Sequence, residues 1–486
     1  MQTFHNSFLF SIWQALRGFF SSQWEHSALV RWFTSQPFGA EPRPERFLPR
    51  YRSAFHRLKL DRVFQNSVFQ NPAWFAFCAI ILSPILPTMG VLALVLASFF
   101  SLAVFLGSHT ASPIRGNPLS KYIVAYAIVY LYATITSTDP AGSLFPGLLT
   151  ALFVLFFLVL ASISPEPAQL RRWLTALVAV GLLVALYGFF QCLFPARFRS
   201  VWTDTDMFSS ITFRAYSTLE NPNMLGAFFL LVIPLCAGLL LSEEKRLRRF
   251  IFLGMLLAMT VCMVLTYSRG CYLGLLFAAA LFLVLLDRRF LIAGVIVLLM
   301  SPLLVPESVW SRFTSIGDMA DSSTSYRVYI WMGTLAMLRH YWFSGIGPGE
   351  GAFNIVYPDY AYNAVTAPHS HNLFLQILCD TGICGLLVFL ILLIAYYRMM
   401  FTAIHRETRK TFKILQISAL SSVSGFLVEG LTDYAFYNYR VMLLFWAVLG
   451  ISVLLCRPSR MRGACSGEQG GSSCAESISE HPTDTP

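Results

Sequence analysis

Charge is scarce in this sequence. Only 12% of its 486 residues are Asp, Glu, Lys or Arg and 56% are hydrophobic, whereas about 25% of a soluble domain is charged. These proportions exclude a soluble globular domain, and 43 phenylalanines spread along the chain exclude an intrinsically disordered one. The alternating strand pattern of an outer-membrane barrel is also missing. Because helices then remain as the way to satisfy the backbone in lipid, we predict an all-α polytopic membrane protein.

The sequence also shows neither a CxxC pair nor the pattern expected of a secretory signal. The ten cysteines form no CxxC pair, and most lie within apolar runs, where cysteine packs as a small hydrophobic residue. We therefore predict no disulfide framework and no cysteine metal centre. The first apolar stretch contains Arg17 and no small-residue cleavage site follows it, so it does not indicate a secretory signal.

Apolar runs long enough to cross a bilayer, which takes about 20 residues each, recur along most of the chain. We predict about twelve spans: 72–88, 89–107, 121–136, 144–163, 173–191, 224–241, 250–266, 271–286, 290–305, 372–397, 413–429 and 440–456. They form a transmembrane domain at 71–456 with one long outer loop at 306–371. Residues 1–70 mix aromatic and basic residues, which predicts a cytoplasmic amphipathic segment on an anionic membrane surface. The polar residues 457–486 predict a disordered cytoplasmic tail.

The basic residues are unequally divided between the two sides of these spans. One side carries 27 of the 35 lysines and arginines, including both termini, which predicts that both termini are cytoplasmic. The net charge of +10 therefore indicates a membrane orientation rather than a nucleic-acid partner. The other side carries arginines and no lysine: Arg197, Arg199, Arg214, Arg269, Arg312, Arg327, Arg339 and Arg440.

The exclusive use of arginine on the outer side suggests a ligand. A guanidinium group matches a phosphate or carboxylate with two parallel N–H donors, whereas lysine is a solvated point charge. We therefore predict an outward site for a phosphorylated or carboxylated ligand. The alternative is that these arginines snorkel or pair with nearby acidic residues: Asp204, Asp206, Glu220, Asp318 and Asp321.

Two short outer motifs supply candidate residues. Arg214 precedes Asn221, Pro222 and Asn223 at the start of the sixth span, where Asn221 is a predicted N-cap and the helix N-terminus can bind an anion. A plain helix start explains the cap but not Arg214. Arg269 lies in a turn of about four residues between the seventh and eighth spans, so we expect it at the mouth of the bundle.

The long outer loop supplies a third group. Tyr326, Arg327 and Trp331 lie in a segment with helical spacing of apolar residues, which predicts an amphipathic helix resting on the bundle. Glycines follow at 345, 347, 349 and 351. Because no strand precedes them, we interpret this segment as a flexible turn that exposes its backbone rather than as a nucleotide loop.

A histidine marks the end of that loop. His371 is predicted to begin the tenth span, beside Asn372 and one helical turn from Gln376. An imidazole placed at the mouth with the arginines can act as a base or bind phosphate, although a lone histidine is usually structural. His369 makes zinc the rival interpretation, but the sequence offers no third ligand at a suitable spacing.

Together these residues resemble a known family. The pattern of His371, Asn372, nine residues, Gly382, two residues and Gly385, preceded by Arg327 and Arg269, is similar to the O-antigen ligase and O-antigen polymerase superfamily of bacterial inner-membrane proteins. The Asn-Pro-Asn cluster and the glycine-rich segment resemble the branch that includes the cyanobacterial inorganic-carbon-transporter-like proteins. The similarity extends over roughly residues 75 to 455.

The resemblance implies a glycosyltransferase of the cytoplasmic membrane that needs neither metal nor cofactor. The donor would be a glycan on undecaprenyl pyrophosphate, and the acceptor a hydroxyl of a glycan or lipid on the outer face. Arg269 and Arg327 would hold the pyrophosphate, His371 would be the base, and Arg214 a further phosphate ligand. Other expected substrate contacts are Asn221, Asn372, Tyr326 and Trp331.

A transporter of a small anion such as bicarbonate is the alternative function. Such a protein would show broken helices and charges near the middle of the bilayer. The sequence places few charges within the spans, and Glu429 and Asp433 flank the outer end of the eleventh one. Charge placement therefore favours the enzyme.

Overall fold

The computed structural model describes residues 48–109, 117–163, 165–198, 213–287 and 321–457, together with 307–314 and positions 289, 294, 317 and 319. These residues form helices and no strand, which confirms the predicted all-α class. Residues 1–47, the tail from 458 and nearly all of the predicted span at 290–305 lie outside the described residues.

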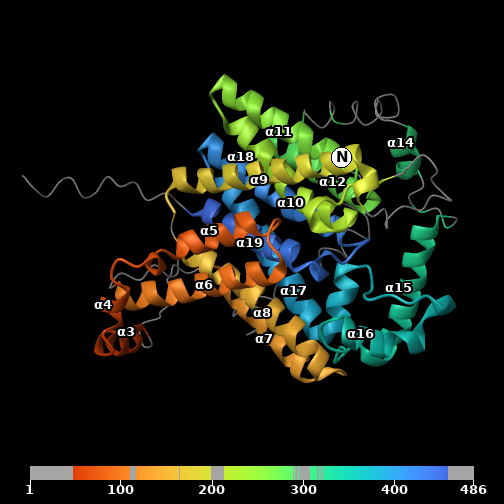
Figure 1. Ribbon diagram of the computed structural model, residues 1–486, viewed down its shortest axis with the longest axis horizontal. Coiled ribbons are helices and arrows are strands. Elements are labelled where there is room, and N and C mark those ends of the chain that lie inside the picture. Colours follow the sequence, from red (N-terminus) through yellow and green to blue (C-terminus); the bar gives the residue numbers. More distant parts are fainter. Residues whose placement is uncertain are drawn as a thin grey trace, which may run out of the picture. The chain divides into compact units, whose positions relative to one another are not determined.

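Helices occupy eleven of the twelve predicted spans (Figure 1). Among the described residues, nine helices are long and apolar enough to cross a membrane, and α5 and α7 are shorter. The eleven are α5 (Pro72–Leu82), α6 (Thr88–Ser108), α7 (Ser120–Ile135), α8 (Pro140–Ser162), α9 (Pro167–Leu193), α10 (Pro222–Ser242), α11 (Arg246–Val264), α12 (Arg269–Leu286), α17 (Leu373–Arg406), α18 (Lys410–Glu429) and α19 (Tyr439–Cys456).

Helices α10, α18 and α19 form the most buried part of the bundle. Helix α18 packs against both α10 and α12, and α19 packs against α8. Gly274 of α12 and Gly425 of α18 bring their backbones so close that a Cβ on either would meet the other's main chain. In lipid the hydrophobic effect does not drive helices together, and small residues at such crossings stabilise the contact because they allow close van der Waals packing.

The predicted loop at 306–371 folds into helices beside this bundle. They are α14 (Glu307–Thr314), α15 (Ser322–Tyr341), α16 (Glu350–Val356), η4 (Tyr357–Tyr360) and η5 (Tyr362–Ala364). Helix α15 confirms the helix predicted around Arg327, and its buried face includes Ile330 and Met337. These residues share a small apolar core with Phe353 of α16 and Cys379 of α17, so the loop is anchored on α17.

Helix α17 is interrupted at Gly382, where φ is 64° and ψ is −170°. The glycine-rich segment fills this break. Ile346 and Gly347 donate backbone N–H groups to the carbonyls of Cys379 (2.7 Å) and Asp380 (3.2 Å). Since those N–H groups are engaged, the segment is not the backbone-exposing turn that its composition suggested. The positive φ of Gly345, Gly347 and Gly349 lets it approach α17 closely.

The basic segment before the first span is helical where the structure describes it. Helices α3 (Leu48–Arg57) and α4 (Leu60–Phe64) and the turn η1 (Val68–Gln70) lie beside α6. Tyr51 donates to the carbonyl of Ala103 (2.9 Å), and Arg52 donates to that of Leu106 (3.1 Å). This part of the segment is therefore held on one end of α6.

Candidate active site

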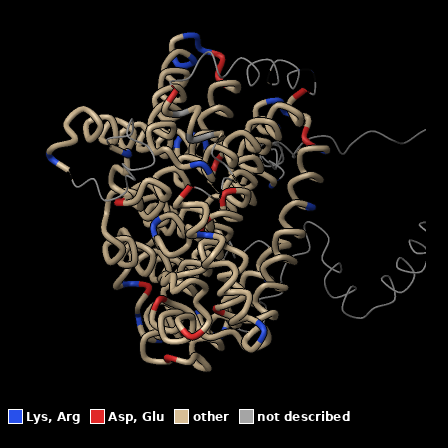
Figure 2. The backbone as a smooth tube through the Cα atoms, turned by 90° about the vertical axis from the view of Figure 1, so that its right-hand side faces the viewer, with Lys and Arg blue, Asp and Glu red and all other residues tan. Residues whose placement is uncertain are grey.

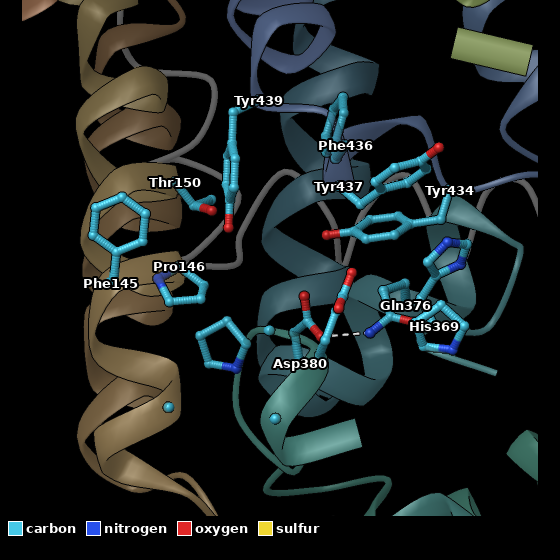
Figure 3. Close-up of a pocket in the computed structure, with 16 residues that line it drawn as sticks. Phe145, Pro146, Thr150, His369, Gln376, Asp380, Tyr434, Phe436, Tyr437 and Tyr439 are labelled. Atoms are coloured by element: carbon cyan, nitrogen blue, oxygen red, sulfur yellow. Dashed lines mark hydrogen bonds between the residues drawn. The ribbon is translucent and has the colours of Figure 1, made fainter. Parts of the chain in front are cut away.

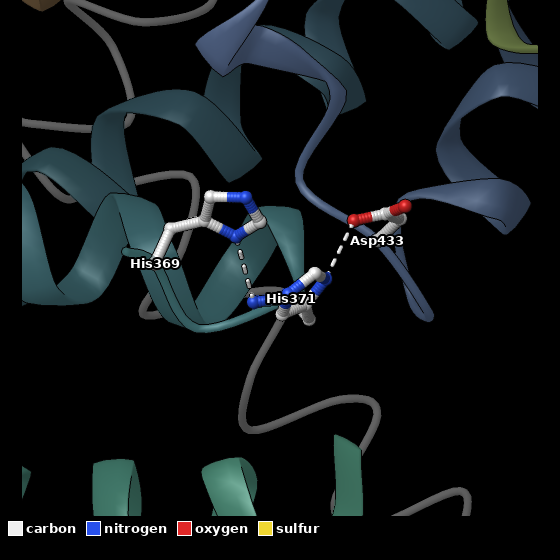
Figure 4. Close-up of side chains that lie close together, drawn as sticks. All are labelled: His369, His371 and Asp433. Atoms are coloured by element: carbon white, nitrogen blue, oxygen red, sulfur yellow. Dashed lines mark hydrogen bonds and ion pairs between the residues drawn. The ribbon is translucent and has the colours of Figure 1, made fainter. Parts of the chain in front are cut away.

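His371 and Asp433 form the centre of the candidate site (Figure 4). His371 Nδ1 lies 3.0 Å from Asp433 Oδ1, and the two side chains are 18% and 5% exposed. His371 has a positive φ of 47°. His371 does not begin the helix as predicted; the helix begins two residues later, at Leu373, because Asn372 is its N-cap and accepts the N–H groups of Phe374 and Leu375. Asp433 lies in the turn between α18 and η6 (Ala435–Tyr437).

The charge state of Asp433 fixes the role of each nitrogen of His371. Burial opposes ionisation of Asp433, but the hydrogen bond from His371 and the nearby positive charges, including that of Arg327, hold its pKa well below its usual range. An ionised carboxylate accepts hydrogen bonds, so His371 donates from Nδ1. The neutral imidazole then carries its free lone pair on Nε2, the arrangement needed in a general base.

His369 supports His371 from the opposite side. Its Nδ1 accepts the backbone N–H of His371 at 3.2 Å, and the two ring centres lie 4.2 Å apart. Burial lowers the pKa of His369 to about 3, and the positive charge of Arg327 acts in the same direction. His369 is therefore neutral and carries its proton on Nε2. It positions the backbone of His371.

Acid should destabilise the protein through His369. A solvated histidine takes up a proton at about pH 6.5, whereas His369 does so at about pH 3. Between these values the unfolded chain binds the extra proton, so stability falls with falling pH, by about 1.4 kcal/mol per unit. Asp433 adds its own loss of stability only below about pH 4.

We expect His369→Gln to reduce the dependence of the thermal-unfolding midpoint on pH between about pH 6.5 and 4. His340→Gln, at an exposed histidine, should leave that dependence unchanged. An equal slope in both variants would contradict a buried neutral His369.

Helix α15 holds the turn that carries His371. Trp331 donates from its indole Nε1 to the His371 carbonyl at 3.3 Å. The Tyr326 ring lies edge-on to the His371 ring at 5.7 Å, and its hydroxyl donates to the Thr366 carbonyl at 3.0 Å. Tyr326 and Trp331 thus contact the candidate base itself, as residues that position it. A direct contact of either with substrate stays a prediction.

One predicted arginine approaches Asp433 directly, and a second is linked to it through Asn223. Arg327 Nη2 lies 3.9 Å from Asp433 Oδ2, which also accepts from Asn223 Nδ2 at 2.7 Å. Asn223 in turn accepts from Arg214 Nη2 at 3.1 Å. Asn221 is the N-cap of α10, as predicted, and accepts the Asn223 N–H. Its cap fixes the turn that presents Asn223 to Arg214 and Asp433.

Arg269 reaches the same region through the start of α15. It pairs with Asp321 at 2.5 Å, and both side chains are nearly buried. Asp321 is the N-cap of α15, and Arg327 donates to Ser323 in the first turn of the same helix. The site therefore combines three arginines with two aspartates. The alternative of pairing with the nearby acidic residues is realised for Arg269 with Asp321 and for Arg440 with Glu220. A phosphate site formed by the arginines stays a prediction. Figure 2, turned toward the end that carries α15, shows charged segments near the middle of the bundle as well as at its two ends.

Two buried polar groups in this cluster have no hydrogen-bond partner among the described residues. They are Arg327 Nε and both carboxyl oxygens of Glu429. Buried polar atoms are nearly always paired, so such atoms indicate where a polar ligand or water is expected. Glu429 ends α18 and interacts electrostatically with Asp433 and Arg327. The unpaired groups therefore lie around the same carboxylate that holds His371.

A metal is the competing use of this centre. The ligand atoms of His369, His371 and Asp433 lie within 4.8 Å of one another, so the structure supplies the third group that the sequence did not reveal. The same atoms have other partners, however. Both oxygens of Asp433 are engaged, Nδ1 of His369 accepts a backbone N–H, and the Arg327 guanidinium lies beside Asp433. Because a neighbouring cation opposes binding of a second one, the hydrogen-bonded pair is the better interpretation.

Residues 253–390 match the family model described as O-antigen ligase. The matched region contains Arg269, Arg327 and His371, and it ends before Asp433. No curated protein matches the chain.

Proposed function

We propose that this chain, whose residues 253–390 match the O-antigen ligase family, transfers or polymerises a glycan carried on a polyprenyl pyrophosphate. The acceptor is a hydroxyl of a glycan or lipid, and the reaction takes place on the outer face of the bacterial cytoplasmic membrane. The observation that carries this proposal is the pairing of His371 with Asp433 beside Arg327 and Arg214.

Each charged group has a part in the proposed reaction. His371 Nε2 takes the proton of the acceptor hydroxyl, whose oxygen forms a bond with the anomeric carbon of the donor glycan. The bond from that carbon to the pyrophosphate oxygen breaks, and the pyrophosphate leaves with the electron pair. Arg214, Arg269 and Arg327 stabilise the charge on the leaving group. Asp433 stabilises the imidazolium formed at His371.

We expect transfer to survive chelation of divalent metals. The arginines supply the positive charge that the pyrophosphate needs, and the ligand atoms of His369, His371 and Asp433 are already hydrogen-bonded. Activity of the purified protein should therefore be the same before and after dialysis against EDTA. Loss of activity that zinc restores would show that these three residues hold a metal.

A transporter remains the second candidate because α17 is broken at Gly382, as the helices of many transporters are. In such proteins the freed carbonyls hold the transported ion. Here the carbonyls of Cys379 and Asp380 accept N–H groups of Ile346 and Gly347, so the break is filled by the protein itself. This packing favours the enzyme. Uptake of bicarbonate into proteoliposomes tests the alternative.

The proposed orientation places the loop that contains η4 outside the cell. Asp359 of η4 and Glu244, which lies between α10 and α11, are both exposed and provide a matched pair. With a membrane-impermeant thiol reagent, Asp359→Cys should be labelled in intact cells. Glu244→Cys should be labelled only after permeabilisation, with the unsubstituted protein as background for the native cysteines. The reverse pattern would place the site on the cytoplasmic side.

Lipid extracts of a strain that lacks this protein test the function. If the protein consumes a carrier-linked glycan, the loaded polyprenyl pyrophosphate accumulates in the deletion strain, and its mass identifies the donor. Re-expression of the protein should remove the accumulated species. An unchanged pool of carrier-linked glycans in the deletion strain would contradict the proposal.

A further inference from the structure

A cavity of about 500 Å³ adjoins the candidate site. This volume is within the range of about 300–1,000 Å³ found for small-molecule sites. Helices α8, α16 and α17 and the turn η6 form its walls (Figure 3). Its aromatic lining includes Phe145 of α8 and Tyr434, Tyr437 and Tyr439 from the chain that follows α18. The cavity is therefore enclosed largely by flat rings.

The polar lining of the cavity is uncharged or acidic. Neither lysine nor arginine is among the described residues that line it. Asp380 accepts hydrogen bonds from Gln376 Nε2 (2.8 Å) and from the Tyr130 hydroxyl (3.3 Å). Glu350 is exposed at the edge of the cavity. A phosphate or a carboxylate entering here would meet the carboxylate of Glu350 and no cation among the described lining residues.

His369 separates this cavity from the arginine cluster. It belongs to the cavity lining, its ring stacks on Tyr437 with centres 5.0 Å apart, and its Nδ1 holds the backbone of His371. The three arginines are absent from the lining residues, and two of them lie on the Asp433 side of His371. The lining beside His369 is thus aromatic and acidic, and the arginines that approach Asp433 are not part of it.

We propose that this cavity binds a sugar ring of the acceptor, either neutral or bearing an amino group, and excludes rings that carry a carboxylate or phosphate. The proposal rests on the proposed glycan transfer. In a displacement at the anomeric carbon, the attacking oxygen and the leaving pyrophosphate lie on opposite sides of that carbon. Since the pyrophosphate needs the arginines, the acceptor needs the compartment without them.

The lining has the chemistry that a sugar ring requires. Aromatic faces carry a negative potential and attract the weakly positive C–H groups on the face of a pyranose, and they attract an ammonium group more strongly. Gln376, Asp380 and the tyrosine hydroxyls provide donors and acceptors for ring hydroxyls. Glu350 adds the charge that separates an amino sugar from an acidic one.

Saturation-transfer NMR on the full-length protein in lipid nanodiscs tests this cavity without requiring catalysis. The probes are methyl glucoside, methyl glucosaminide and methyl glucuronide at millimolar concentration. We expect signals from the first two and none from the glucuronide. Phe145→Leu should remove most of the signal, whereas Phe343→Leu, a matched change of an exposed aromatic residue outside the cavity lining, should not. Glu350→Gln should admit the glucuronide.

The outcomes separate this proposal from the proposed function. A glucuronide signal equal to that of the glucoside, or signals that Phe145→Leu leaves unchanged, would overturn the sugar cavity even if glycan transfer is observed. The expected binding pattern in a protein that consumes no carrier-linked glycan would overturn the transfer and leave a carbohydrate-binding cavity. Binding together with transfer supports both.

Discussion

Replacement of His371 by alanine should abolish glycan transfer while leaving the donor bound. The side chain supplies the only imidazole that is both paired with Asp433 and partly exposed in the cluster, since His369 is buried and neutral. Loss of a general base costs about 10²–10⁴ in rate. His369→Ala should be milder because it acts on the His371 backbone alone. His340→Ala, an exposed histidine of α15, is the matched control.

Asp433→Asn separates the role of the pair from that of the ring alone. An asparagine amide can donate to His371 Nδ1, which places the imidazole proton on Nε2 and removes the lone pair needed for catalysis. We expect a loss of transfer activity approaching that of His371→Ala. Asp359→Asn, a matched change at an exposed position, should keep full transfer activity. Full activity of Asp433→Asn, with stability unchanged, would contradict the assignment of Nε2 as the base.

Arg327→Lys should remove most of the activity although the charge is kept. Arg327 donates to Ser323, lies 3.9 Å from Asp433 and has a buried Nε with no partner among the described residues. A lysine provides no planar fork and no Nε donor, so it cannot make paired hydrogen bonds to a phosphate. A loss of about 2.7–4 kcal/mol in transition-state stabilisation corresponds to roughly 10²–10³ in kcat.

Arg339→Lys provides the control for this change. Arg339 lies near the end of the same helix and is exposed. The substitution therefore makes the same chemical change on α15 away from the candidate site. It should keep full activity. Equal activity of Arg327→Lys and the unsubstituted protein would show that Arg327 only neutralises the charge of Asp433.

Helices and their caps were predictable from local sequence. The long apolar runs gave eleven of the predicted spans among the described residues, because each run by itself satisfies the length and composition that a bilayer demands. Asn221 before Pro222 predicted the start of α10, because the N-cap and the first helical residue are adjacent in the sequence. Signals of this kind need no knowledge of the rest of the chain.

The partners of the site residues were not predictable in this way. His371 and Asp433 are 62 positions apart, and Asn223 and Asp433 are 210 apart, so no periodicity connects them. The one sequence signal for Asp433 was an acidic residue placed just beyond the outer end of a span. The glycine-rich segment was misinterpreted for the same reason, because its N–H groups are satisfied by carbonyls of α17 that only the fold brings near.

The proposed glycan transfer is tested most directly by measuring how much carrier is released from its glycan. The loaded polyprenyl pyrophosphate from the deletion strain, incubated with the purified protein and acceptor-bearing membranes, should be converted to free polyprenyl pyrophosphate and a glycosylated acceptor. His371→Ala should bind the same donor and convert none of it. A protein that leaves the donor intact under these conditions, or a His371→Ala variant that converts it at the unsubstituted rate, would contradict the account.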